Sequence, residues 1–116
     1  MIMDELATKH CVPCEQGGEP LPAHVAATLL RRLKGWMLVD NKLLRQELVM
    51  KDFAEAVRLI DAIARVADAE DHHPDLHLTG YRRLRLELTT HAVGGLTEND
   101  FILAAKIDEL PRELKA

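Results

Sequence analysis

The chain has 116 residues, with 15 Lys and Arg against 19 Asp and Glu and a formal net charge of -4. This length favours one compact domain, and a hydrophobic content of 47% can support a core without disulfide or metal staples. The acidic balance argues against binding through phosphate contacts, so we expect no direct nucleic-acid binding. No apolar run approaches the roughly 18 residues of a membrane span, and the N-terminus lacks the pattern of a signal peptide. We therefore expect a soluble, cytoplasmic protein with no membrane partner.

The first twenty residues contain Pro and Gly but no sustained apolar period. They predict an N-terminal arm over residues 1–20, followed by a single domain over residues 21–116. The arm holds Cys11 and Cys14, the only cysteines, spaced C-x-x-C after His10. A closed zinc site needs four ligands, and the strand–helix setting of a thioredoxin-like motif is absent. Inert cysteines are therefore favoured over a metal or redox role.

The domain is predicted to begin with a helix and a hairpin. Apolar residues recur at helical spacing over residues 22–33, where Pro22 suits the first turn and Gly35 the position after the end. Two strands are predicted next, over residues 36–39 and 42–50. They flank Asp40-Asn41, which can take the positive φ values of a tight hairpin turn.

A second helix is predicted from Asp52, which forms a capping pair with Glu55. Its apolar stripe continues to Pro74, where the missing N–H ends any regular run. The stripe comprises Phe53, Val57, Ile60, Ile63, Ala64 and Ala67.

The rest of the chain predicts a second hairpin and a last helix. Residues 76–78 and 81–91 read as strands joined by a Thr79-Gly80 turn, and Leu84, Leu86 and Leu88 alternate with charged residues as in a half-buried strand. By the same parity His91 is expected on this strand, opposite the leucines. The last helix should open at Thr97, with Asp100 three residues on, and end near Pro111.

These elements predict an α+β fold with the order α-β-β-α-β-β-α. Short connections favour antiparallel hairpins, so we expect a four-stranded antiparallel sheet with the helices packed on one face, in two layers.

Four of the six histidines, His72, His73, His77 and His91, fall within twenty residues. An imidazole with a pKa of about 6.5 can donate or accept a proton near neutral pH, so the cluster favours acid–base chemistry. The chain has no serine and no phosphate-binding glycine motif, which argues against a Ser–His–Asp triad and a nucleotide site. The alternative is a metal site, built from His72, His77 and His91 or from His10, Cys11 and Cys14.

The pattern around the histidines is an acidic residue, three positions, His-His-Pro, an aromatic residue and a later histidine. Here these are Asp68, His72-His73-Pro74, Tyr81 and His91. With Gly35-Trp36, Lys51-Asp52-Phe53 and Gly95-Leu96-Thr97 followed by Asp100, the chain resembles the pterin-4a-carbinolamine dehydratases from about Leu21 to Leu110.

The resemblance implies dehydration of 4a-hydroxytetrahydrobiopterin (pterin-4a-carbinolamine) to quinonoid dihydropterin and water. The substrate is the form in which an aromatic amino-acid hydroxylase leaves its pterin, and no metal or organic cofactor is implied. By resemblance His72 and His91 form the acid–base pair, and His73 chiefly binds and orients the pterin.

The resemblance also implies substrate-binding roles for Asp68, Pro74, Trp36 and Tyr81. Asp68 is expected to orient a histidine, the alternative being a solvated charge. Trp36 and Tyr81 have structural alternatives, and for Tyr81 the structural interpretation is favoured.

Two implications concern partners. A homodimer or homotetramer is expected, with an exposed strand edge or the last helix as the seam. The alternative function is a protein-interaction module, a dimerisation cofactor of a transcription factor, with or without dehydratase activity.

Overall fold

The computed structural model describes residues 5–13 and 18–116, so the prediction for Cys14 lies outside the described residues. The elements are α1 (Glu5–Thr8), α2 (Ala23–Leu30), β1 (Met37–Val39), β2 (Leu43–Val49), α3 (Phe53–Glu70), β3 (Asp75–Thr79), β4 (Arg83–Leu88), the 3-10 helix η1 (His91–Val93) and α4 (Glu98–Asp108). From α2 onward this confirms the predicted order of main helices and strands.

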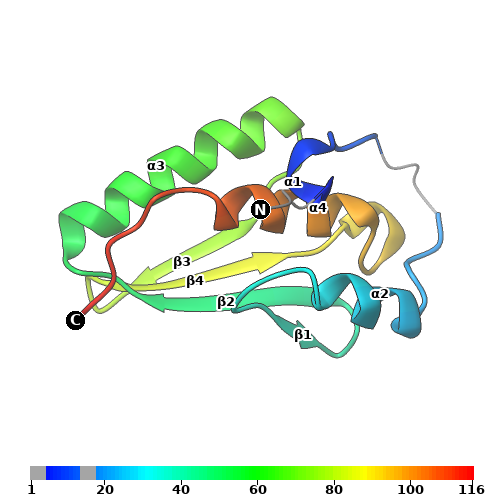
Figure 1. The fold of residues 1–116 in the computed structure, drawn as a ribbon, viewed down its shortest axis with the longest axis horizontal. Helices are drawn as coiled ribbons and strands as arrows, with labels where there is room; N and C mark the ends of the chain where they lie inside the picture. The colour runs from blue at the N-terminus through cyan, green and yellow to red at the C-terminus, as the bar shows by residue number, and fades with distance from the viewer. Residues whose placement is uncertain (1–4, 14–17) are drawn as a thin grey trace.

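The four strands form one antiparallel sheet in the order β1-β2-β4-β3. Helices α3 and α4 lie over the same face of this sheet (Figure 1), as predicted. Leu84, Leu86 and Leu88 of β4 are buried beneath them, so the alternation in the sequence identified the core face correctly.

The first hairpin has the predicted turn. Asp40 and Asn41 both have positive φ, and the Lys42 N–H donates to the Val39 carbonyl to close the turn.

Helix α3 begins as predicted, because the Asp52 carboxylate accepts the Glu55 N–H at 2.8 Å. The Glu55 side chain binds Arg58 instead of completing the capping box. The helix ends at Glu70, because Asp71 takes the left-handed conformation (φ 52°) three residues before Pro74. The run up to Pro74 was therefore predicted too long.

The predicted apolar stripe of α3 is only partly the buried one. The residues that reach the core are Ala56, Leu59, Ile63 and Ala67, whereas Phe53 and Val57 are exposed. At 100° per residue Phe53 and Val57 lie beside the buried face rather than on it. The apolar stripe of the sequence therefore does not coincide with the buried face of α3 in the single chain.

The β3–β4 hairpin differs from the prediction at both ends. Tyr81 has a positive φ of 54° and lies in the turn, not in the strand. Strand β4 ends at Leu88, and His91 begins η1, so its expected position by strand parity was wrong. The cause is an exchange of backbone hydrogen bonds between Thr90 and Gly95, which turns the chain out of the sheet.

The N-terminal segment contributes to the core. Helix α1 packs against α4, and its Leu6 is fully buried, so the packed structure starts before Leu21. A helix of four residues is too short to give a periodic pattern in the sequence. Most of α4 is buried within the single chain, and the oligomer seam expected at an exposed strand edge or the last helix stays a prediction. Within residues 5–13 and 18–116, no helix is long and apolar enough to cross a membrane.

Candidate active site

The second hairpin brings distant histidines to one end of the sheet. Strands β3 and β4 are antiparallel, so the start of β3 lies beside the end of β4, and Asp75 pairs with Glu87. His72 and His73 directly precede β3, and His91 follows β4. Residues almost twenty positions apart therefore meet at the same end of the sheet.

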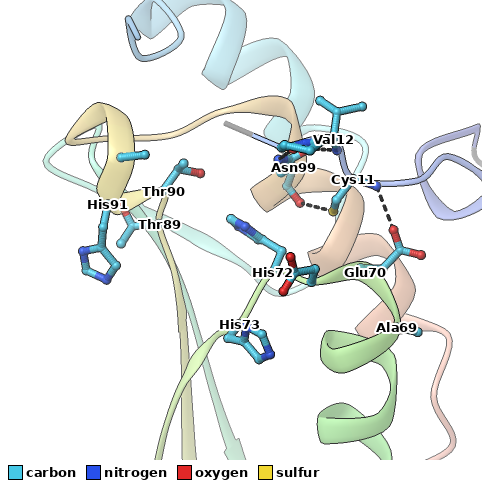
Figure 2. A pocket seen from close by; sticks show the side chains of 13 residues that line it. Cys11, Val12, Ala69, Glu70, His72, His73, Thr89, Thr90, His91 and Asn99 are labelled. Atoms are coloured by element: carbon cyan, nitrogen blue, oxygen red, sulfur yellow. Dashed lines mark hydrogen bonds between the residues drawn. The ribbon is translucent and has the colours of Figure 1, made fainter. Parts of the chain in front are cut away.

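A cavity of about 650 Å³ opens at this end of the sheet. Figure 2 shows His72, His73 and His91 around it, with the threonines that follow β4 on one side and the N-terminal segment on the other. The lining residues are Cys11, Val12, Pro13, Ala69, Glu70, Asp71, His72, His73, Thr89, Thr90, His91, Ala92 and Asn99.

His72 is held by a buried carboxylate. Its Nε2 lies 2.7 Å from Asp100 Oδ1, and the two side chains are 12% and 0% exposed. When the carboxylate is ionised it only accepts hydrogen bonds, so this pairing needs the proton on Nε2 and leaves a lone pair on Nδ1 of the neutral ring. The arrangement gives His72 a defined tautomer with a free acceptor nitrogen.

Asp100 is fixed in turn by the start of α4. Its Oδ2 accepts the Thr97 N–H at 3.0 Å, within the predicted capping box, and the Thr90 hydroxyl at 2.8 Å. The Thr97 and Thr90 hydroxyls are also within hydrogen-bond distance of each other, at 2.9 Å. One residue therefore caps the helix and orients a histidine.

His73 and His91 are more open to solvent. His73 Nε2 lies 3.0 Å from Asp68 Oδ1, but these side chains are 58% and 77% exposed. His91 is exposed at the start of η1. Pro74 follows His73 and is not among the lining residues of the cavity.

Trp36 and Tyr81 do not line this cavity. The Trp36 ring is buried, and its Nε1 donates to Asp108 Oδ1 at 2.8 Å. Asp108 ends α4, about 12 Å along the helix from Asp100. Tyr81 is exposed beneath the Arg82 guanidinium, and the length of β3, about 16 Å, separates its turn from the histidines.

The alternative metal sites are not assembled among the described residues, which contain no group of three His, Cys, Asp or Glu placed to hold an ion. His77 lies within β3, does not line the cavity, and its Nε2 lies 3.3 Å from Glu87 Oε1. Burial alone raises the pKa of Glu87, but its hydrogen bond and ion pair with Arg45 and the nearby His77 outweigh this and lower the pKa. The second proposed set includes Cys14, outside the described residues.

Sequence reasoning missed two features of the site. Asp100 was read as a helix cap, although an acidic residue that follows a histidine cluster was a usable signal. The contribution of Cys11, Val12 and Pro13 to the cavity had no sequence signal, because it depends on contacts with residues 59 to 88 positions away.

The cavity can perform proton transfer, since three imidazoles line it and one of them, His72, pairs with the buried Asp100 carboxylate. A family model described as "Pterin 4 alpha carbinolamine dehydratase" matches residues 19–110. The chain belongs to this family.

Individual relatives agree with the match. A Nitrosospira multiformis protein named for the same family is 45% identical over 108 residues, covering 93% of this chain and 94% of that protein. The Arabidopsis thaliana protein "Pterin-4-alpha-carbinolamine dehydratase 2, mitochondrial" is 43% identical over 113 residues, covering 94% of this chain and 60% of that protein. The crystal structure of a transcriptional coactivator/pterin dehydratase from Brucella melitensis has a TM-score of 0.72 at 32% identity and covers 78% of this chain and 96% of that one.

Proposed function

We propose that this pterin dehydratase family member removes water from a pterin-4a-carbinolamine by histidine acid–base catalysis. The observation that carries the proposal is that His72, which pairs with the buried Asp100, lines the same cavity as His73 and His91. The reaction needs a base and an acid on one substrate, and these groups provide both.

The proposed reaction breaks one C–O bond and moves two protons. His72 Nδ1 takes the proton of the pterin N5, and the electron pair of that N–H bond forms the C4a=N5 double bond. The C4a hydroxyl leaves as water with a proton from His91. The products are quinonoid dihydropterin and water, and no electrons are gained or lost.

The assignment of base and acid rests on surroundings. The Asp100 carboxylate stabilises the imidazolium that forms when His72 accepts a proton, which favours His72 as the base. His91 is exposed and can exchange protons with solvent, which suits the acid. His73, paired with Asp68, is assigned to binding and orienting the pterin.

The test is to generate 4a-hydroxytetrahydropterin with an aromatic amino-acid hydroxylase and follow its dehydration by absorbance. Wild type is compared with His72→Ala and His91→Ala, and each substitution is expected to lower kcat by about 10²–10⁴-fold. The variants should also differ in pH profile, because His72→Ala removes the limb set by the base and His91→Ala the limb set by the acid.

His77→Ala is the matched control, since it removes an exposed histidine that does not line the cavity. It should keep wild-type rates. No acceleration by folded wild type, or full activity in His91→Ala, would contradict the proposal.

The substrate and its source are part of the proposal. We take 4a-hydroxytetrahydrobiopterin as the physiological pterin and an aromatic amino-acid hydroxylase as its source. Contacts of the substrate with Asp68, Pro74, Trp36 or Tyr81 stay predictions. None of these four residues lines the cavity, and the KM of Trp36→Phe and Tyr81→Phe tests the two aromatic ones.

A homodimer or homotetramer is supported by apolar side chains that one chain leaves in solvent. Phe53 and Val57 are exposed on α3, and Met37 is exposed on the edge strand β1. Phe53→Glu with Val57→Glu is expected to reduce the assembly measured by analytical ultracentrifugation. If the mass of the assembly is unchanged in this variant, the subunit interface would be assigned to a strand edge instead.

The same α3 surface supports the second candidate function, protein interaction, and the Brucella relative is described as a transcriptional coactivator. Retention of activity together with loss of partner binding in the α3 variant would separate the two roles. A cytoplasmic location stays a prediction, since the Arabidopsis relative is named mitochondrial. Cell fractionation tests it.

A further inference from the structure

The chain before the first predicted helix forms part of the cavity. Residues 10–13, the N-terminal strap, pass the end of α3 and the start of α4 (Figure 2). Cys11, Val12 and Pro13 of the strap line the same cavity as the three histidines. The proposed reaction gives the strap no role.

Glu70 fastens the strap to the end of α3. Its Oε1 accepts the Cys11 N–H at 2.7 Å, and its Oε2 lies 2.9 Å from His10 Nδ1. Lys106 of α4 lies 3.6 Å from the same carboxylate, whose side chain is only 7% exposed.

Glu70 keeps its charge despite this burial. Desolvation raises the pKa of the carboxyl, but the Cys11 N–H, His10 and the charge of Lys106 together outweigh it and lower the pKa. The ionised carboxylate can therefore accept both strap hydrogen bonds at neutral pH.

Asn99 fastens the strap to the first turn of α4. Its Oδ1 accepts the Val12 N–H at 3.0 Å, and its Nδ2 donates to the Val12 carbonyl at 2.6 Å. The buried carboxamide pairs with both main-chain groups of Val12, as a neighbouring strand would. Two buried side chains from two helices thus fix three consecutive strap residues.

The two sides of the cavity differ in chemistry. Thr89, Thr90 and His91 on the hairpin side are polar, whereas the strap side chains are Cys, Val and Pro. A flat heterocycle with polar edges, such as a pterin, suits a site with one apolar side and several placed polar groups.

We propose that the N-terminal strap positions the pterin against the acid–base histidines, with Glu70 and Asn99 as the positioning residues that hold it. The inference rests on the proposed function and adds an element on the side of the cavity opposite η1. A strap fixed in advance avoids the loss of binding energy that ordering it around each substrate would cause.

Glu55 offers a matched control. It is also a glutamate of α3, and it accepts a backbone N–H from a segment far along the chain, that of Glu113, at the same distance of 2.7 Å. The C-terminal segment that it holds does not line the cavity. Glu55→Gln and Glu70→Gln therefore make the same chemical change at two tethers, of which only one reaches the site.

The experiment uses the full chain and two readouts. The Kd of biopterin, a stable oxidised pterin, is measured by quenching of its fluorescence, and KM and kcat are measured for 4a-hydroxytetrahydropterin. Glu70→Gln should raise Kd and KM by about five- to twentyfold with kcat changed less than about threefold, whereas Glu55→Gln should leave all three unchanged. Asn99→Leu should act like Glu70→Gln and carries the test if Glu70→Gln does not fold.

Hydrogen–deuterium exchange separates positioning from a purely structural tether. Biopterin should slow exchange at the Cys11 and Val12 amides of wild type, and less so in Glu70→Gln. An unchanged Kd in both Glu70→Gln and Asn99→Leu, or no protection of the strap by bound biopterin, would overturn the inference. Wild-type turnover would then leave the dehydratase function standing. Wild type that neither binds biopterin nor accelerates dehydration would overturn both.

Discussion

Two consecutive histidines each pair with an aspartate, and the two pairs differ in burial. His72 and Asp100 are 2.7 Å apart and 12% and 0% exposed, whereas His73 and Asp68 are 3.0 Å apart and 58% and 77% exposed. The distances are similar, but only the first pair is shielded from water. Similar geometry therefore does not imply a similar energetic role.

The difference decides which carboxylate can control a histidine. Water competes for exposed polar groups, so a surface His–Asp pair contributes about 0–1 kcal/mol and holds its partner loosely. A buried carboxylate with several donors is held in one orientation. We therefore expect Asp100 to orient its histidine more firmly than Asp68 does.

Asp100→Asn should give the largest effect. The amide can still accept the Thr97 N–H, but its NH₂ can replace the acceptor that faces His72 Nε2, which favours the wrong tautomer. We expect kcat to fall about 10–100-fold with little change in KM. Nitrogen chemical shifts of the His72 ring, measured by NMR, should report the change of tautomer. A lower kcat with an unchanged tautomer would assign the loss to the helix cap instead.

Thr90→Val should give a smaller effect on the same pair. It keeps the shape of a buried side chain but removes the hydroxyl that donates to Asp100 at 2.8 Å. We expect kcat to fall about two- to fivefold and the free energy of unfolding to fall by about 1–2 kcal/mol. Steady-state kinetics and urea denaturation check the two numbers. A loss as large as that of Asp100→Asn would mean that Thr90 itself contacts the substrate.

The sequence predicted the elements well where local rules decide them. The Asp52 cap, the Asp40-Asn41 turn and the buried leucines of β4 all follow from patterns within a few residues. The family resemblance predicted one site for the three histidines, which line one cavity, and their catalytic roles stay predictions.

Long-range packing explains what the sequence could not predict. His91 lies outside β4 because the backbones of Thr90 and Gly95 hydrogen-bond to each other. Phe53 is exposed although it belongs to a helical apolar stripe. Asp100 is fully buried, and two of its partners, His72 and Thr90, lie outside the helix that it caps. A carboxylate at a helix start is usually solvated, so a capping role alone was the reasonable prediction.

Asp68→Asn should change the rate least among the histidine partners. The pair is exposed, so replacing the carboxylate removes little, and we expect kcat and KM within about twofold of wild type. Raising the salt concentration should shrink even this difference. Steady-state kinetics at low and high salt check it, and a loss of tenfold or more would show that bound substrate buries the pair.

Asp108 extends the comparison to a carboxylate that faces no histidine. It lies at the other end of α4, where it accepts the Trp36 Nε1–H at 2.8 Å and a weaker bond from the Lys34 N–H at 3.4 Å. Burial raises the pKa of Asp108 above 3.8, and this exceeds the lowering by those donors and by Arg112. Because the folded state holds this proton more tightly than the unfolded state, the stability that Asp108 contributes declines as the pH rises from 3.8 through the raised pKa.

Asp108→Asn should therefore change how stability depends on pH without changing catalysis. Asparagine does not titrate, so the free energy of unfolding of wild type minus that of the variant should be largest at acidic pH and should decrease toward neutral pH. Urea denaturation at several pH values between 4 and 7 measures the difference. Because Asp108 is about 12 Å along α4 from Asp100, kcat should stay within about twofold of wild type. A wild type that gains stability over the variant as the pH rises would show that the Trp36 and Arg112 contacts outweigh burial, and a large loss of kcat would show that the two ends of α4 are coupled.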